Sequence, residues 1–242
     1  MDKMRVVFED KEIIVVYKPA GLATQTAKIG QPDLVSEIKN YSHASYLGVV
    51  HRLDQPVEGL LVFGKTKEAA AALTKQLGQG TLNKQYYAVI CGRTEPESAE
   101  LVDFLYKTKE NRAELVPSEQ AAEWGAKKAV LQFKILEKQD ILLDADDGKA
   151  AIALADIHID TGRFHQIRAQ MAYAGMPLLG DGKYGDERSR DISRKLGVRN
   201  VALCAYTLEL CHPGTGKRMV FAAAPSGMIF EKFAIKNLRE NC

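Results

Sequence analysis

The chain has 242 residues, of which 46% are apolar and 26% charged, and this composition excludes a disordered protein because it supplies enough apolar surface for a substantial core. It contains no apolar run near the roughly 20 residues that cross a bilayer and no secretory signal pattern, so we expect a cytoplasmic protein without a membrane segment. The net charge of +2 does not by itself indicate a nucleic-acid binder. A local excess of cations lies between Lys183 and Arg199, although a solvated helix face explains it almost as well.

Strands and helices alternate in the first part of the chain. Residues 12–18 are apolar and β-branched and predict a buried strand that ends at a Pro-Ala-Gly turn, and residues 32–41 predict a short helix. A second apolar strand over 59–65 is followed by a helix over 66–77, whose first residue is a threonine that can cap it. The chain then returns to a strand over 82–92.

A hairpin is predicted in the middle of the chain. Asp147-Gly148 favours a tight turn, and the apolar runs 127–137 and 150–160 flank it as strands.

The next predicted helix begins at Asp160 or Thr161 and is ended by Gly175. Its apolar residues recur at spacings of three and four and predict a buried stripe. The stripe consists of Phe164, Ile167, Met171 and Ala174. Arg168 lies at the margin of this stripe, where an arginine usually has a carboxylate partner.

The last part of the chain predicts a hairpin of strands over 201–211 and 217–223, followed by a closing helix over 225–238. Strands outnumber helices and mostly adjoin in sequence, so we predict an α+β fold with a largely antiparallel sheet. No repeat or linker divides residues 1–242, which favours a single domain. The four cysteines lack CxxC spacing, which favours reduced thiols over a zinc site or a disulfide framework.

Two motifs far apart in the sequence fit together. HRLD at 51–54 offers a carboxylate beside an arginine, and TGRFHQIR at 161–168 offers a helix-borne arginine that can pair with that carboxylate. With KQYYAVICG at 84–92 between them and GDGKYG at 180–185 after them, the chain resembles the RluA-type pseudouridine synthases. The resemblance runs from about residue 9 to residue 185, with weaker agreement beyond.

The resemblance implies an RNA-modifying isomerase and a role for each matching residue. Asp54 becomes the essential carboxylate, and Arg52 the arginine that occupies the space left by the flipped base. The KxYxA register selects Tyr86 as the tyrosine that stacks on the uracil and is a candidate for handling its C5 proton. Arg168 pairs with Asp54, and Ile167 helps to wall the uracil pocket.

This chemistry explains why those residue types are needed. Pseudouridine formation breaks the bond between N1 of uracil and the ribose, turns the base and rejoins it through C5. An ionised carboxylate beside the ribose carbon and a base for the C5 proton are required, and the uridine must leave its stack. No redox or net hydrolytic step occurs, so no cofactor and no metal are expected.

The resemblance also implies an architecture and a partner. We expect one pseudouridine synthase catalytic domain over 1–242, with a mixed, largely antiparallel sheet, flanking helices and a central cleft. The chain leaves no room for the small N-terminal RNA-binding domain of longer relatives, so the catalytic domain must grip its RNA, ribosomal or transfer RNA, by itself. A monomer is the default for such enzymes.

Several positions depart from the family pattern. Gln55, Pro56, Val57 and Glu58 replace a basic residue, an acidic residue and Thr-Ser, and Phe164 and Ala169-Gln170 replace Thr and Val-His. These departures spare the three predicted catalytic residues, so they bear on loop contacts and substrate choice.

Less specific interpretations compete at several motifs. Without the second motif, Asp54 would be read as a turn carboxylate, and His51 and His165 are read as structural supports of their loops. GDGKYG satisfies GxGxxG, but no strand precedes it, so a loop that needs glycine geometry is the better reading. A glycosidic-bond hydrolase and a non-catalytic RNA-binding protein remain as alternative functions. The hydrolase lacks an evident second carboxylate, and a binder would have been free to lose Asp54.

Overall fold

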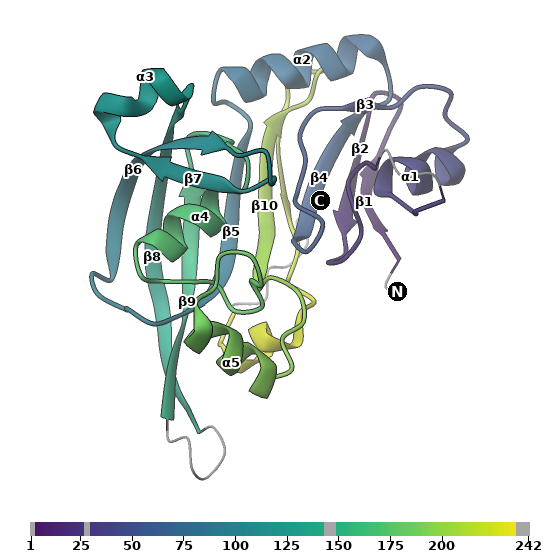
Figure 1. Cartoon of the computed structure of the whole chain (residues 1–242). Coiled ribbons are helices and arrows are strands. Elements are labelled where there is room, and N and C mark those ends of the chain that lie inside the picture. The colour runs from purple at the N-terminus through teal and green to yellow at the C-terminus, as the bar shows by residue number, and fades with distance from the viewer. Residues whose placement is uncertain (1–2, 27–29, 143–148, 236–242) are drawn as a thin grey trace. The chain divides into compact units, whose positions relative to one another are not determined.

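We describe the fold from a computed structural model. The described residues are all those outside 1–2, 27–29, 143–148 and 236–242. The chain forms two compact units, which we call the first and the second unit (Figure 1). The first unit consists of Met1–Gln85, Cys204–Ser226 and Ile235–Cys242, and the second unit consists of Tyr86–Leu203 and Gly227–Ala234.

The first unit contains a sheet in the order β1-β2-β4-β10-β11, with β3 also paired to β4. Its strands are β1 (Arg5–Glu9), β2 (Ile13–Lys18), β3 (Gly48–Val49), β4 (Glu58–Gly64), β10 (Leu203–Cys211) and β11 (Arg218–Ala222). All pairs are antiparallel except β4 with β10, where Gly59 lies opposite Ala205. Gly59 has a positive φ of 128°, and a Cβ there would lie 2.4 Å from the Ala205 nitrogen, so only glycine fits this close approach.

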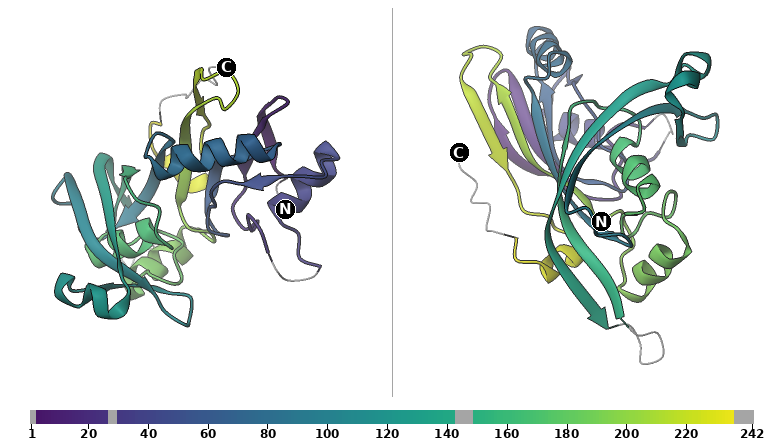
Figure 2. Two further views of the ribbon diagram at one scale, coloured as in Figure 1. Left: turned by 90° about the horizontal axis from the view of Figure 1, so that it is seen from above. Right: turned by 90° about the vertical axis from the view of Figure 1, so that its left-hand side faces the viewer.

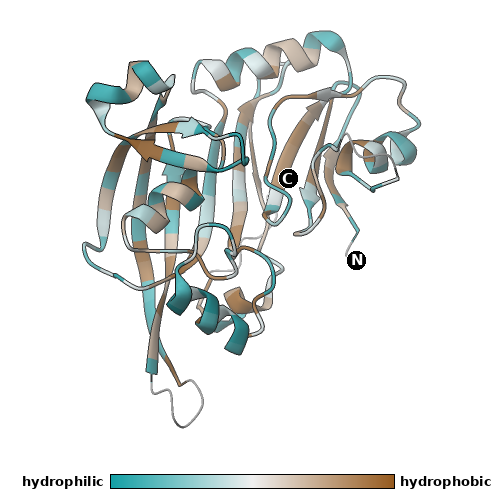
Figure 3. Cartoon of the chain, in the orientation of Figure 1, coloured by the Kyte–Doolittle hydropathy of each residue, from teal (hydrophilic) through white to brown (hydrophobic). Residues whose placement is uncertain are grey.

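Two helices accompany this sheet. Helix α1 (Leu34–Ser42) is capped by Asp33, which accepts from the Ser36 nitrogen at 2.7 Å. Helix α2 (Lys67–Gly78) packs against β3 and β4 and is capped by Thr66, as predicted, which accepts from the Ala69 nitrogen at 3.1 Å. The core of this unit lies in β2 and β4, whose residues are all buried and which are coloured largely as apolar in Figure 3.

The second unit contains a sheet in the order β5-β9-β8-β6-β7. Its strands are β5 (Asn83–Cys91, entering from the first unit), β6 (Ser98–Lys107), β7 (Ala113–Val116), β8 (Lys127–Leu142) and β9 (Lys149–Ile159). Strands β8 and β9 pair antiparallel over most of their length, and the right-hand view of Figure 2 shows them as one long curved pair. The predicted strands over 127–137 and 150–160 are thus confirmed, whereas the predicted turn at Asp147-Gly148 lies outside the described residues.

Three short helices complete the second unit. They are α3 (Ala121–Trp124), α4 (Gln166–Tyr173) and α5 (Glu187–Lys195). Helix α4 packs against β6, β7 and β8, where Ala169 joins a buried cluster with Leu105, Ala113 and Ala129. Helix α5 is strongly polar (Figure 3), and Arg194 and Lys195 pair with Asp191 on the same helix, as expected of a solvated helix face.

Two predicted helices differ from the structure. Helix α4 begins at Gln166 because His165 adopts a left-handed conformation with φ of 51°, which no helix continues, so neither Asp160 nor Thr161 caps it. Among the described residues, the closing helix predicted over 225–238 is a 3₁₀ turn over Met228–Lys232, and positions 236–238 lie outside the described residues. Two backbone groups of this segment hydrogen-bond to side chains of β8 instead of continuing a helix. Gln139 donates to the Lys232 carbonyl, and Glu137 accepts from the Ala234 nitrogen at 2.9 Å.

The prediction of an α+β fold with a mostly antiparallel sheet is confirmed. The strands β1, β3, β6 and β7 and the helix α3 were not predicted, and a helix in the region of α5 was considered only as a solvated helix face. Among the described residues, no helix is long and apolar enough to span a membrane.

Candidate functional site

The HRLD motif forms an irregular segment of the first unit just before β4. Its residues alternate in exposure. His51 and Leu53 are buried, whereas Arg52 is exposed and Asp54 is half-buried. Leu53 is fixed by Thr24, whose hydroxyl donates to the Leu53 carbonyl at 2.9 Å and accepts from its nitrogen at 3.2 Å. The Val57 nitrogen donates to the Asp54 carbonyl at 3.0 Å and closes a turn directly after the carboxylate. The segment therefore anchors its apolar positions and presents its two charged ones.

Lys18 is a buried lysine beside this segment, and the sequence analysis did not single it out. Its Nζ donates to the carbonyls of Pro19 at 3.0 Å, Leu22 at 2.7 Å and Gln55 at 3.2 Å. Burial lowers the pKa of Lys18 to about 7, whereas the carboxylates of Asp54 and Glu58 act to raise it. Lys18 thus ties the end of β2 to the residue that follows Asp54. The sequence feature that could have pointed to Lys18 is its position, because it ends an apolar strand and precedes Pro-Ala-Gly.

Glu58, one of the departures from the family pattern, is also buried in the first unit. Its Oε2 accepts from the Tyr17 hydroxyl at 2.8 Å and from the Ser226 nitrogen at 3.2 Å, and it also bonds the Ser226 hydroxyl. Burial and the neighbouring Cys204 and Glu58 raise the pKa of Tyr17, so its hydroxyl stays protonated and donates. Glu58 therefore joins β2 and β4 to the segment after β11, and its carboxylate is committed to these contacts.

His51 has a buried imidazole whose Nε2 accepts from the Val62 nitrogen at 3.3 Å. Burial and the positive charge of Lys84 hold the pKa of His51 well below its usual value, so the ring is neutral with its proton on Nδ1. Within the described part of the chain, this Nδ1 has no hydrogen-bond partner. His51 supports the start of the HRLD segment from β4, as a structural residue would.

In the second unit, the two tyrosines of the KQYYA run lie on β5. Tyr86 is 4% exposed and Tyr87 8% exposed, so burial does not distinguish the predicted uracil-stacking residue from its neighbour. Only the sequence register selects Tyr86.

Arg168 lies on α4 and is 5% exposed, so it is part of the buried face of the helix rather than its margin. Its Nε donates to Oδ2 of Asp181 at 2.7 Å and its Nη2 to Oδ1 at 2.9 Å, a two-pronged ion pair. Oδ1 also accepts from the nitrogens of Lys183 and Tyr184, each at 3.0 Å. Although burial acts to raise it, the pKa of Asp181 is lowered by Arg168 and by these backbone donors, so the carboxylate is ionised.

The motif GDGKYG therefore supplies two residues that contact Arg168 and that the sequence analysis missed. Asp181 grips the guanidinium, and the ring of Tyr184 lies 5.1 Å from its carbon. The Tyr184 hydroxyl accepts from the Ala113 nitrogen at 2.7 Å and hydrogen-bonds Nδ1 of His165 at 2.8 Å. Gly180, with φ of 74°, lets the loop turn, which agrees with the expected glycine geometry. An acid beside two glycines, near a motif with a conspicuous arginine, was the signal for Asp181.

The residues around Arg168 correct part of the predicted stripe. Ile167 is buried at 5% exposure, but Phe164 is 37% exposed because it precedes the helix and stacks on His165 with ring centroids 3.7 Å apart. The loop before the helix is held by Gln166, whose Oε1 accepts from the Thr161 hydroxyl at 2.8 Å and from the Arg163 nitrogen at 2.9 Å. Helix α4 and the loop before it thus hold Arg168 in place within the second unit.

The predicted site residues divide between the units. Asp54 and Arg52 belong to the first unit, and Tyr86, Ile167 and Arg168 to the second. The ion pair of Asp54 with Arg168 stays a prediction from the two motifs. In the described ranges, no group of three or more His, Cys, Asp or Glu side chains is arranged to hold a metal ion.

Comparisons with known proteins identify the family to which this chain belongs. The family described as RNA pseudouridylate synthase matches residues 12–173, and the chain belongs to this family. Ribosomal large subunit pseudouridine synthase D of Neisseria meningitidis serogroup A is 31% identical over 244 residues, which cover 96% of this chain but only 61% of that relative. The tRNA pseudouridine synthase C of Salmonella typhimurium is 26% identical and is covered over 85% of its length by 91% of this chain. The solved structure of human RNA pseudouridylate synthase domain containing 1 shares the fold, with a TM-score of 0.73 and 18% identity over 92% of this chain and 84% of that one.

Proposed function

We propose that this protein is an RNA pseudouridine synthase that isomerises a specific uridine in structured RNA. The observation that carries the proposal is the family match over residues 12–173, which includes both the HRLD and the GRFHQIR motifs. The relatives named above act, by their names, on the ribosomal large subunit and on tRNA, so ribosomal and transfer RNA are the two candidate substrates.

In the proposed reaction, Asp54 acts at the ribose carbon as nucleophile or as counter-charge while the bond to N1 of uracil breaks. The uracil turns, its C5 bonds to the ribose carbon, and the C5 proton is removed while N1 gains one, so no atom is lost overall. Tyr86 is proposed to stack on the uracil and to handle the C5 proton. Arg168 is proposed to pair with Asp54, Arg52 to fill the space left by the flipped base, and Ile167 to wall the pocket.

Contacts within each unit support these roles. Asp54 is half-buried in a segment that Lys18 holds through the Gln55 carbonyl, at 3.2 Å from its Nζ. Arg168 is oriented by a two-pronged contact with Asp181, which fixes the plane of the guanidinium. The chemistry needs neither a cofactor nor a metal, and we propose a cytoplasmic monomer.

The alternative of a glycosidic-bond hydrolase needs a second accessible carboxylate. The carboxylate nearest in sequence to Asp54 is Glu58, which is 3% exposed and occupied by Tyr17 and Ser226. Glu58 therefore does not favour hydrolysis. An RNA-binding protein without activity remains an outcome of the experiment below.

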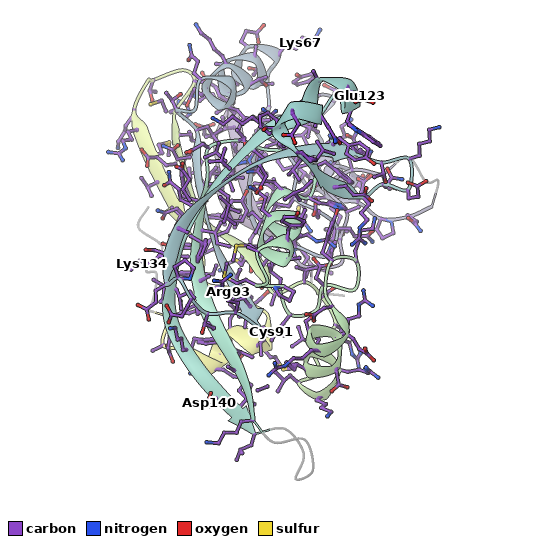
Figure 4. All side chains as sticks on the ribbon, turned by 60° about the vertical axis from the view of Figure 1, so that its left-hand side comes forward. Lys67, Cys91, Arg93, Glu123, Lys134 and Asp140 are labelled. Atoms are coloured by element: carbon purple, nitrogen blue, oxygen red, sulfur yellow. The ribbon has the colours of Figure 1, made fainter. Side chains whose placement is uncertain are left out.

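The experiment uses ribosomal and transfer RNA transcripts that carry tritium at C5 of uridine. Wild type is expected to release tritium and to give a mass-neutral product that stops reverse transcription after carbodiimide treatment. Asp54→Asn is expected to abolish release while RNA binding persists. The matched control is Asp140→Asn on β8, an exposed aspartate labelled in Figure 4, which should retain turnover. Free uracil as product, or unmodified RNA with both transcript classes, would contradict the proposal.

A further inference from the structure

A cavity of about 420 Å³ lies entirely within the second unit. Its lining comes from the ends of β6 and β8, from α3 and from the loop before α4. The lining residues are Leu105, Tyr106, Lys107, Trp124, Gly125, Lys127, Gly162, Arg163 and Phe164, which we call the aromatic pocket. Its volume falls in the range of roughly 300–1,000 Å³ that is usual for small-ligand sites.

Two aromatic side chains of the pocket are unusually open to solvent. Trp124 is 49% exposed and lies 5.1 Å from the ring of Tyr106. Phe164 is 37% exposed, and its ring is backed by the stacked imidazole of His165. Large exposed aromatic surface beside polar groups is typical of a binding site rather than of an ordinary surface.

Cations accompany these rings. Lys107 places its Nζ 4.6 Å from the ring centroid of Phe164, and Lys127 is exposed on β8. Arg163 is fixed by a hydrogen bond from its Nε to the Lys128 carbonyl at 2.9 Å. Neither Asp nor Glu occurs among the nine lining residues, all of which lie in the described part of the chain. The acidic Glu123 precedes Trp124 on α3 (Figure 4), outside the lining.

We infer that the aromatic pocket binds an unpaired nucleotide of the substrate RNA. On binding, the Lys107 ammonium moves from the face of Phe164 to the phosphate, and the base takes its place against Phe164 and Trp124. Lys127 and Arg163 complete the phosphate contacts. Aromatic faces beside a cationic groove are the arrangement by which proteins hold single-stranded nucleic acid. The chemistry therefore fits a nucleobase with a phosphodiester better than it fits an apolar or cationic ligand. The inference deepens the proposed function, on which it rests for the identity of the RNA.

The pocket is connected to the predicted catalytic arginine by direct contacts within the second unit. Phe164 stacks on His165, His165 hydrogen-bonds Tyr184 at 2.8 Å, and the ring of Tyr184 lies against Arg168. Phe164 and Arg168 are also only four residues apart, which limits their Cα separation to ~14 Å. A nucleotide in the pocket thus lies within a few nucleotides of a uridine at Arg168. Phe164 replaces the threonine usual in the family, so this ring would give the chain a substrate contact of its own.

The first test uses the intrinsic fluorescence of Trp124, which is the single tryptophan of the chain. Wild type is titrated with a ten-nucleotide oligouridylate and, separately, with heparin as a polyanion without bases. Saturable quenching by oligouridylate but not by heparin is expected, because only a stacked base contacts the indole. Absence of quenching at saturating oligouridylate, as judged by anisotropy of a labelled oligonucleotide, would overturn the inference.

The second test replaces the ring without changing the apolar character of the site. Phe164→Leu is expected to weaken oligouridylate binding roughly 5- to 150-fold, the effect of losing one base stack. Tyr41→Leu on α1 is the matched control, because Tyr41 is an exposed aromatic of the first unit, and its affinity should equal that of wild type. Equal affinities of the Phe164→Leu variant and wild type would refute base stacking at the pocket.

The third test concerns the phosphate. Lys127→Gln should reduce the dependence of log affinity on log salt by about one phosphate contact. Lys134→Gln, which removes another exposed lysine farther along β8 (Figure 4), should not change it. Equal slopes for the two variants would contradict the assignment of the phosphate to this pocket.

These binding measurements are independent of turnover. If wild type binds oligouridylate through Phe164 but forms no pseudouridine, the proposed function fails and the pocket stands as an RNA site. If turnover is normal and the Phe164→Leu variant binds and reacts as wild type does, the inference fails and the proposed function stands.

Discussion

Arg168 grips Asp181 through two parallel hydrogen bonds, from Nε to Oδ2 at 2.7 Å and from Nη2 to Oδ1 at 2.9 Å, with both side chains buried. A guanidinium held at two points has a fixed plane and direction, which a single contact would not provide. Asp181 is itself held by two backbone nitrogens of its loop. The loop that follows α4 therefore helps to hold Arg168 in its orientation. This contribution of Asp181 can be tested separately from the arginine itself.

Asp181→Asn is expected to lower the free energy of unfolding by on the order of 3 kcal/mol, because it removes the negative charge that holds the buried guanidinium of Arg168 at two points. Turnover should fall as well, since Arg168 loses its orientation. Urea unfolding and the tritium-release assay measure the two effects. Asp191→Asn is the control, because it removes exposed contacts on α5 and should change stability by about 0.5 kcal/mol or less. Equal stability of the two variants would show that the ion pair is not a stabilising contact.

Arg168→Lys keeps the positive charge but removes the planar guanidinium with its two parallel hydrogen-bond donors. A lysine ammonium cannot make two parallel bonds to Asp181, so the charge would no longer be held in place. We expect turnover to fall by roughly 100-fold or more, as for other misplaced catalytic groups, with little change in RNA affinity. Arg194→Lys on α5 removes an exposed arginine and should react as wild type does. Near-normal turnover of the Arg168→Lys variant would show that charge alone is sufficient.

The elements that were predicted correctly are those whose structure depends on local residue patterns. The apolar run of β4, the Thr66 cap of α2 and the hairpin of β10 with β11 all follow from local patterns. Strand β6 was missed because only one of its residues is fully buried, so its pattern carries little apolar signal. The start of α4 was misplaced because Gln166 and His165, rather than a capping residue, fix that loop.

The same division holds for the candidate site. The motifs that the chain shares with the family selected Asp54, Tyr86 and Arg168, and the roles of these residues stay predictions. Lys18 bonds a carbonyl 37 residues away as well as two nearby ones, and Asp181 bonds Arg168 from 13 residues away, so the sequence features at these positions did not reveal the distant partners. The exposure of the Phe164 ring was also not predicted. The position of Phe164 in the sequence fits the apolar stripe of a helix, but the residue lies before the helix.

Tyr86→Phe and Tyr87→Phe form a matched pair, because both hydroxyls belong to buried tyrosines of β5. If Tyr86 handles the C5 proton, its phenylalanine variant should bind RNA as wild type does but release tritium far more slowly. Tyr87→Phe should leave the rate of release unchanged at saturating RNA. Single-turnover rates with tritiated RNA distinguish the two variants. Slower release in Tyr87→Phe alone would reverse the assignment and show that the KxYxA register was misread.

Lys18 gives a prediction on stability and pH. Its pKa is about 7 in the folded protein, against about 10.4 for an unperturbed lysine. Between these values the unfolded chain binds more protons than the folded chain, so the contribution of Lys18 to the free energy of unfolding rises with pH. Below about pH 7 both states are protonated and the contribution is constant. The slope within the window is at most ~1.4 kcal/mol per pH unit.

The measurement is the difference in unfolding free energy between wild type and Lys18→Met from pH 6 to pH 10, in which the titration of all other groups largely cancels. The difference should grow with pH across the window, while the same comparison with Lys134→Met, an exposed lysine, should stay flat. The three carbonyls around Nζ act in the opposite direction to burial, because only an ammonium has three hydrogens to donate to them. A flat difference for Lys18→Met would therefore mean that these carbonyls keep Lys18 charged throughout. In that case Lys18 would be a permanent cation beside Asp54 rather than one that titrates near neutrality.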